Sequence, residues 1–278
     1  MPDNGLMRFA KGHGTGNDFV ILPDPDGELA VTPALVRALA DRRFGIGGDG
    51  VLRVVRAAKH PEATRYAADA EWFMDYHNAD GSVAEMCGNG VRVFARYLRD
   101  TGLADADEIP LATRSGVVTA VLSGGEVTVD MVPPVLGPPS RAVLAGREYP
   151  GTSCSVGNPH LVCPVDELST MDLSAPPGLD PAVFPHGANV EFTTAGAPVA
   201  GADGHVHMRV HERGSAETLS CGSGACAAAA VALRDAGLPA GRVAVDVPGG
   251  RLVVTLDAVR CRLTGPAVIV AHGEINLP

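Results

Sequence analysis

Two cysteines stand in the same short motif in different halves of the chain. Residues 87–90 are Cys-Gly-Asn-Gly and residues 221–224 are Cys-Gly-Ser-Gly, and each motif precedes a segment that predicts a helix. The first N–H groups of a helix have no intrahelical partner and carry a partial positive charge. A helix start therefore binds carboxylate or phosphate, and it can lower a cysteine pKa toward about 3.5–7.5. The motif predicts an anion cradle beside a reactive thiol.

A pair of such thiols suits a reaction that needs two bases. Removing a proton from one face of a carbon and returning one to the other face takes one thiolate and one thiol. The Cα–H of an amino acid is a very weak acid, so donors aimed at its carboxylate must stabilise the developing charge. Cys87 and Cys221 therefore predict an amino-acid epimerase. The alternative is that both are buried, inert capping residues.

The sequence around the two motifs repeats. Cys87 matches Cys221 at an offset of 134 positions (221 − 87). Other pairs recur at this offset, namely Met74 with Met208, His77 with His211 and Gly116 with Gly250. Further pairs match at a slightly larger offset, namely Asn17 with Asn158 and Asp49 with Asn189. The repeat predicts two similar halves, and a site shared by them is expected in the cleft between them.

Periodicity predicts an α+β fold. Helices are expected over 33–43, 90–99 and 224–236, and strands near 17–22, 51–57, 71–76, 117–122, 126–131, 206–210, 243–247 and 252–256. The proline-rich residues 132–139 predict an extended linker, because proline cannot donate to a sheet. We expect halves over 1–131 and 132–267, each a mixed sheet or barrel around a central helix, with 268–278 returning to the first half.

Composition narrows the class of protein. Hydrophobic residues make up 46% and charged residues 19% of the 278 residues, which is enough to bury a sizeable core. A formal net charge of −10 disfavours nucleic acid and anionic membranes as partners. The sequence has no apolar run of about 18 residues and no secretory signal, so a cytoplasmic protein is expected.

Cofactor and metal signals are weak. Lys11 and Lys59 are the two lysines of the sequence, which leaves a pyridoxal-phosphate Schiff base few positions. His205 and His207 would share one strand face, but no close Cys or His completes a four-ligand zinc set. We therefore expect neither a metal nor a cofactor. The remaining cysteines are expected to be buried thiols: Cys154, Cys163, Cys226 and Cys261.

Longer motifs resemble those of the diaminopimelate epimerase family, whose members interconvert LL- and meso-2,6-diaminopimelate without a cofactor. The matching stretches are GTGNDFV (14–20), NADGSVAEMCGNGVR (78–92), GNPH (157–160), GANVEF (187–192), HERGSAETLSCGSGACA (211–227) and VPGG (247–250). The resemblance implies the two-half fold of that family and a role in lysine and peptidoglycan-precursor biosynthesis. It also implies a small-molecule substrate and a possible homodimer.

The resemblance also implies roles for individual residues. Cys87 and Cys221 would be the acid/base pair, and His160 with Glu212 would tune the pKa of the thiols. Substrate would be bound by Asn17, Asn78, Gly88, Asn89, Asn158, Asn189, Glu212, Arg213, Gly222 and Ser223. In this set Arg213 suits a two-pronged contact with the distal carboxylate. Family members often have Gln at the position of Gly50, where it contacts substrate, and Tyr at that of Ala271, where it is linked to dimer formation. This chain has neither side chain.

Two other functions are compatible with paired cysteines. A thiol redox or binding protein could use Cys87 and Cys221 as a switching disulfide, and it would not depend on Glu212 or Arg213. A racemase of proline or hydroxyproline would also use two thiols. Its substrate has no distal amino-acid end, so the asparagines and Arg213 would be superfluous.

Overall fold

The computed structural model describes residues 6–276, which divide into two compact units. Unit 1 contains residues up to 129 together with residues from 266 onward, and unit 2 contains residues 130–265. Residues 1–5 and 277–278, which belong to the expected first half, lie outside the described residues. No helix within the described part of the chain is long and apolar enough to span a membrane.

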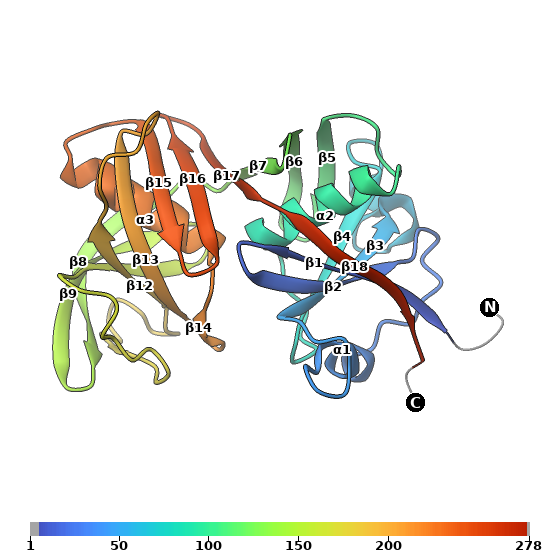
Figure 1. Cartoon of the computed structure of the whole chain (residues 1–278), viewed down its shortest axis with the longest axis horizontal. Helices are drawn as coiled ribbons and strands as arrows, with labels where there is room; N and C mark the ends of the chain where they lie inside the picture. Colours follow the sequence, from blue (N-terminus) through green and yellow to red (C-terminus); the bar gives the residue numbers. More distant parts are fainter. Residues whose placement is uncertain (1–5, 277–278) are drawn as a thin grey trace. The chain divides into compact units, whose positions relative to one another are not determined.

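Unit 1 is a mixed sheet with one long helix. Its elements are β1 (Met7–Gly14), β2 (Asn17–Pro23), α1 (Pro33–Ala40), β3 (Gly50–Arg56), the short 3₁₀ helices η1 (Ala57–Lys59) and η2 (Thr64–Tyr66), β4 (Trp72–Asn78), α2 (Gly88–Asp100), β5 (Glu108–Thr113), β6 (Gly116–Ser123), β7 (Glu126–Met131) and β18 (Val268–Ile275). The strand β18 runs antiparallel beside β1, which is also paired with β2 (Figure 1). Residues far apart in the sequence thus share one sheet.

Unit 2 has the same plan. Its elements are β8 (Val135–Leu144), β9 (Arg147–Ser155), β10 (Pro159–Pro164), β11 (Gly178–Leu179), β12 (Asn189–Ala195), β13 (Gly204–Glu212), β14 (Ala216–Thr218), α3 (Gly222–Asp235), β15 (Gly241–Val247), β16 (Gly250–Leu256) and β17 (Cys261–Pro266). The strand β8 pairs with β9 as β18 pairs with β1. The parallel pairs β10–β12 and β13–β15 correspond to β2–β3 and β4–β5. The predicted internal repeat is confirmed.

One helix lies at the centre of each unit. α2 contacts every strand from β1 to β6 as well as β18, and α3 contacts β9, β10, β12, β13, β15 and β16. Both helices are buried over most of their length, because strands cover them on several sides. A helix so enclosed cannot shift its first turn without disturbing the sheet, so each unit holds its Cys-Gly-x-Gly motif in place.

Two sequence expectations are wrong. Residues 135–139 belong to β8 and not to a linker, and the pairing with β9 shifts register between Leu136 and Pro139. A bulge of this kind is where a sheet tolerates proline. The register also corrects one match of the repeat. His160 pairs with Asn189, whereas its counterpart Phe19 pairs with Gly50, so Gly50 and not Asp49 corresponds to Asn189.

Candidate active site

Cys87 occupies the capping position of α2. The backbone N–H of Gly90 donates to the Cys87 sulfur over 3.4 Å, and Gly88 and Asn89 form the first turn of the helix. The side chain of Cys87 is half-buried, while Asn89 is buried. The motif therefore places a sulfur directly at the positive end of α2, as the sequence predicts.

A network of polar side chains holds Asn17 beside this thiol. The Asn17 Oδ1 atom lies 3.7 Å from the Cys87 sulfur and accepts a hydrogen bond of 3.2 Å from the Asn89 amide. The Asn17 amide donates to Asp49 Oδ2 over 2.8 Å. Asp49 in turn accepts from Arg42 over 2.7 Å. Asn17 thus has a fixed orientation, and Asp49, which was not among the predicted site residues, sets it.

Asn78 and Gly50 face each other across β3 and β4. The Asn78 amide donates to Ser82 Oγ over 3.0 Å, so it is oriented by the following turn. A Cβ atom at position 50 would lie 2.6 Å from both the His77 carbonyl oxygen and Cε2 of Tyr76. The absence of a side chain at Gly50 is therefore a packing requirement of this chain, and a Gln side chain has no room here.

Cys221 caps α3, but its surroundings differ from those of Cys87. Its side chain is buried, and its sulfur lies 3.6 Å from Ser223 Oγ. Burial, together with the nearby Glu212 and Glu191 carboxyls, raises the pKa of Cys221 well above its ordinary value. The helix start alone predicted a lowered thiol pKa, and for Cys221 that prediction is wrong, because desolvation of the thiolate outweighs the helix dipole.

Glu212 lies at the end of β13, close to Cys221. Its carboxylate accepts a hydrogen bond from the Thr218 hydroxyl. Burial raises the pKa of Glu212, and the hydrogen bonds from Thr218 and Cys221 oppose that shift. The structure thus brings Glu212 and Cys221 together within unit 2, as the sequence motifs predict.

His160 lies between two polar partners inside the unit. Its Nε2 atom is 3.0 Å from Asn158 Oδ1, and its Nδ1 atom is 2.7 Å from Glu191 Oε1. His160 and Glu191 are fully buried. The sequence analysis assigned His160 and Glu212 to tuning the thiols and did not name Glu191. Its signal was a carboxylate between two apolar residues of the strand, Val190 and Phe192.

Asn189 and Arg213 are in contact. The backbone N–H of Arg213 donates to Asn189 Oδ1 over 2.9 Å, while its guanidinium donates to the His186 carbonyl over 3.3 Å. Arg213 is exposed. Since a single backbone carbonyl occupies only one of its five N–H donors, the guanidinium can still bind a carboxylate.

The four remaining cysteines and the His205–His207 pair lie outside the candidate site. The thiols Cys154, Cys163, Cys226 and Cys261 are buried, as predicted. Ligand atoms of His205, His207 and Asp246 lie within 4.8 Å of one another, so an acidic residue joins the two histidines considered in the sequence. Arg251 donates to both carboxylate oxygens of Asp246, at 2.6 and 2.8 Å. This group is therefore held together as an ion-pair network.

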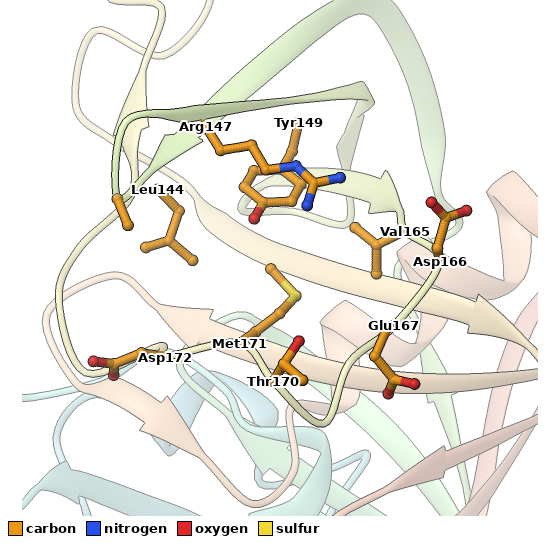
Figure 2. A pocket seen from close by; sticks show the side chains of 10 residues that line it. Leu144, Arg147, Tyr149, Val165, Asp166, Glu167, Thr170, Met171 and Asp172 are labelled. Carbon is orange, nitrogen blue, oxygen red and sulfur yellow. The ribbon is translucent and has the colours of Figure 1, made fainter.

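A cavity of about 340 Å³ lies in unit 2, and neither Cys87 nor Cys221 lines it. Figure 2 shows Arg147 over Tyr149 on one side of the cavity, with Asp166, Glu167 and Asp172 around it. None of the predicted site residues lines this cavity. It is separate from the two groups of residues around Cys87 and Cys221.

Comparison with known proteins shows the family. The family model described as diaminopimelate epimerase matches residues 9–137 and 152–276. The diaminopimelate epimerase of Thermobifida fusca is 55% identical, with 98% of each chain covered. That of Streptomyces coelicolor is 53% identical, covering 97% of this chain and 96% of the relative.

Solved structures share the fold at low identity. A phenazine biosynthesis protein of the PhzF family from Bacillus anthracis has a TM-score of 0.69 at 17% identity, covering 97% of this chain and 99% of the other. A hydroxyproline epimerase from Agrobacterium vitis has a TM-score of 0.66 at 16% identity, covering 99% and 94%. These structures show the architecture alone. Together with the two capped helices and the full-length relatives, the family match establishes that this chain belongs to the diaminopimelate epimerase family of isomerases.

Proposed function

We propose that this protein interconverts LL- and meso-2,6-diaminopimelate by proton transfer between Cα of the substrate and two cysteines. Cys87 and Cys221 act as the acid/base pair, one on each face of the reacting carbon, and neither direction needs a cofactor. The observation that carries the proposal is that both thiols cap central helices at matching positions of the repeat.

The helix starts supply the electrostatic help that the reaction needs. The backbone N–H groups of Gly88 and Asn89, and of Gly222 and Ser223, lie in the first turns of α2 and α3. Negative charge that develops on the substrate carboxylate is stabilised by such donors, each worth about 10²–10³ in rate. The site proposed here therefore takes one helix start from each unit.

The remaining residues are assigned to binding the rest of the substrate. The Arg213 guanidinium binds the distal carboxylate, and Glu212 accepts a hydrogen bond from the reacting ammonium group. The distal amino-acid end is held by the asparagines of both units: Asn17, Asn78, Asn158 and Asn189. His160 and Glu212 tune the thiols, since both lie on the Cys221 side of the proposed site.

The biological setting follows from the substrate. Diaminopimelate supplies lysine and peptidoglycan precursors, so the enzyme is assigned to that biosynthesis in the cytoplasm. A homodimer stays a prediction, and sedimentation of the purified protein tests it. Ala271 lies exposed on β18, where relatives often have Tyr.

The decisive experiment follows hydrogen exchange at Cα. The protein is incubated with meso-diaminopimelate in D₂O without any added cofactor, and deuterium uptake and the LL isomer are measured together. L-proline and trans-4-hydroxy-L-proline serve as comparison substrates. We expect exchange and LL product with diaminopimelate only.

Two outcomes would reject the proposal. Exchange with the prolines but not with diaminopimelate would favour a proline-type racemase. Reversible oxidation of the thiols, without hydrogen exchange on any amino acid, would favour a redox or binding role.

A further inference from the structure

A buried pair of ionisable groups lies beside the start of α3. The Nδ1 atom of His160 and Oε1 of Glu191 are 2.7 Å apart, and both side chains have no exposed surface. Among residues 6–276, the second carboxylate oxygen, Oε2, is buried and has no hydrogen-bond partner. A buried unpaired oxygen costs about 1–3 kcal/mol, so stability alone does not account for Glu191.

The corresponding pair in unit 1 is apolar. His160 corresponds to Phe19, because each lies two residues after a matched asparagine, Asn158 or Asn17, and pairs in register with the next parallel strand. Two residues further along that next strand, Glu191 corresponds to Leu52. The same place in the fold thus holds two apolar side chains in one unit and two ionisable ones in the other.

The last glycines of the two motifs reflect this difference. A Cβ atom at Gly224 would lie 2.6 Å from Glu191 Oε1, whereas one at Gly90 would meet only ordinary contacts of 3.4–3.6 Å with Cys87, Leu52 and Phe19. The Glu191 carboxyl therefore lies against the first turn of α3, three residues beyond Cys221. A carboxylate at this end of a helix is stabilised by the helix dipole.

Building on the function proposed above, we propose that Glu191 is a positioning residue of the reaction: its carboxyl at the first turn of α3 controls when Cys221 loses its proton, and through His160 it orients Asn158. Both ring nitrogens of His160 face oxygen atoms, Glu191 Oε1 at Nδ1 and Asn158 Oδ1 at Nε2, so each of the two contacts needs a hydrogen between its atoms. Glu191 thereby orients His160, and His160 orients the substrate-binding Asn158.

The charge of Glu191 acts on Cys221 in a known direction. A negative charge near a thiol disfavours the thiolate, and Glu191 contributes in this sense to the raised pKa of Cys221. The other titratable groups facing Glu191 lie on every strand packed against it: Cys154 on β9, His160 and Cys163 on β10, and Glu212 on β13. Unlike these groups, Cys221 lies at a helix start.

The test measures the two thiols separately in one sample. The intact protein is treated with a small thiol reagent, methyl methanethiosulfonate, across a pH series, and modification of each cysteine is read by peptide mass spectrometry. In Glu191→Gln we expect the pH midpoint for Cys221 to fall by about one unit. Cys87 is the internal reference, and its midpoint should not move.

A second variant and a charge control complete the design. Glu191→Leu copies the residue that unit 1 carries at Leu52, and it should shift Cys221 in the same direction. Glu167→Gln removes an exposed carboxylate of the same unit and should leave both midpoints unchanged. An unchanged Cys221 midpoint in both Glu191 variants, or an equal shift at Cys87, would overturn the proposal.

The pH profile of kcat/KM for diaminopimelate gives an independent readout. In Glu191→Gln the limb of the profile assigned to Cys221 should move to lower pH. If the substitution only disturbed the structure, it would instead lower kcat/KM equally at all pH values. If the wild-type protein does not epimerise diaminopimelate, the proposed function fails while the modification series still tests Glu191. If it does epimerise and neither readout moves, only the role of Glu191 fails.

Discussion

The groups of residues around Cys87 and Cys221 occupy equivalent places in the two units, yet they differ in chemistry. Around Cys87 the partners of the thiol and of Asn17 are amides and an Asp49–Arg42 ion pair that is partly exposed to solvent. Around Cys221 they are the Ser223 hydroxyl and two carboxyls, the fully buried Glu191 and the partly exposed Glu212. One repeat therefore presents two thiols to different electrostatic surroundings.

This difference shows what a duplicated motif does and does not determine. The Cys-Gly-x-Gly sequence sets where each helix begins, because its cysteine occupies the N-terminal capping position of both α2 and α3. The pKa of the thiol depends instead on side chains from other strands, since burial and two carboxyls raise it at Cys221 despite the helix dipole. Proton affinity can thus diverge between the units while the geometry of the motif is kept.

Replacing either cysteine should have the largest effect. We expect Cys87→Ala and Cys221→Ala each to reduce epimerisation by at least about 10³-fold, because a proton removed on one face cannot be returned on the other. Each variant should still exchange the α-hydrogen of one isomer with D₂O, and the two should choose opposite isomers. One variant inert in every assay and the other nearly normal, with both folded, would contradict two-base transfer.

Arg213→Lys should have the next largest effect. The substitution keeps the charge but removes the planar fork that fits a carboxylate. We expect kcat/KM for diaminopimelate to fall about 10²-fold, since a misplacement of about 1 Å is enough for such a loss. Steady-state kinetics measure it, and Arg242→Lys, on exposed surface of the same unit, is the control. Unchanged kinetics would remove Arg213 from the site.

Alanine at the two matched glycines, Gly90 and Gly224, should change the stability of the protein by different amounts. Gly224→Ala places a Cβ atom 2.6 Å from the Glu191 carboxyl, so we expect a loss of about 1–3 kcal/mol in the free energy of unfolding. Gly90→Ala meets only ordinary contacts and should change it by less than about 1 kcal/mol. Any helix-propensity gain is common to both variants and cancels. Thermal melts of the pair measure the difference, and equal losses would contradict the assigned crowding at Gly224.

Asp49→Asn should have the smallest effect. The variant removes the charge that holds the Asn17 amide and Arg42, so Asn17 should lose its fixed orientation. Because Asp49 is partly exposed, we expect only about a tenfold decrease in kcat/KM. Asp26→Asn, in an exposed ion pair with Arg56, is the control and should leave the kinetics unchanged. A decrease of the same size in both variants would argue against the role of Asp49.

Local sequence patterns predicted much of the fold. The three helices and the repeat were recognisable because caps, glycines and apolar periodicity act within a few residues. The strand β8 was missed because its prolines look like a linker, and only its pairing with β9 shows that they lie at a bulge. α2 begins at Gly88, earlier than predicted, because the motif itself forms the first turn.

The candidate site was less readable from the sequence. The cysteines and asparagines stand in motifs, so their positions could be predicted together with the helix starts. Glu191 and Asp49 act through partners 31 and 32 residues away in sequence, His160 and Asn17. Strand register decides such contacts, and a register cannot be derived from local periodicity. For the same reason the raised pKa of Cys221 was not foreseen.

The pairing of β1 with β18 has a consequence for how the protein is made. A ribosome adds about 5–20 residues per second, so β1 emerges some tens of seconds before its neighbour β18. Unit 2 is one continuous segment, so its strands can pair during that interval. The nascent unit 1 meanwhile presents β1 as an open sheet edge, the kind of surface that templates aggregation. Chaperone dependence during synthesis should therefore concentrate on the earliest strand of the chain, and it should end when residue 275 leaves the exit tunnel.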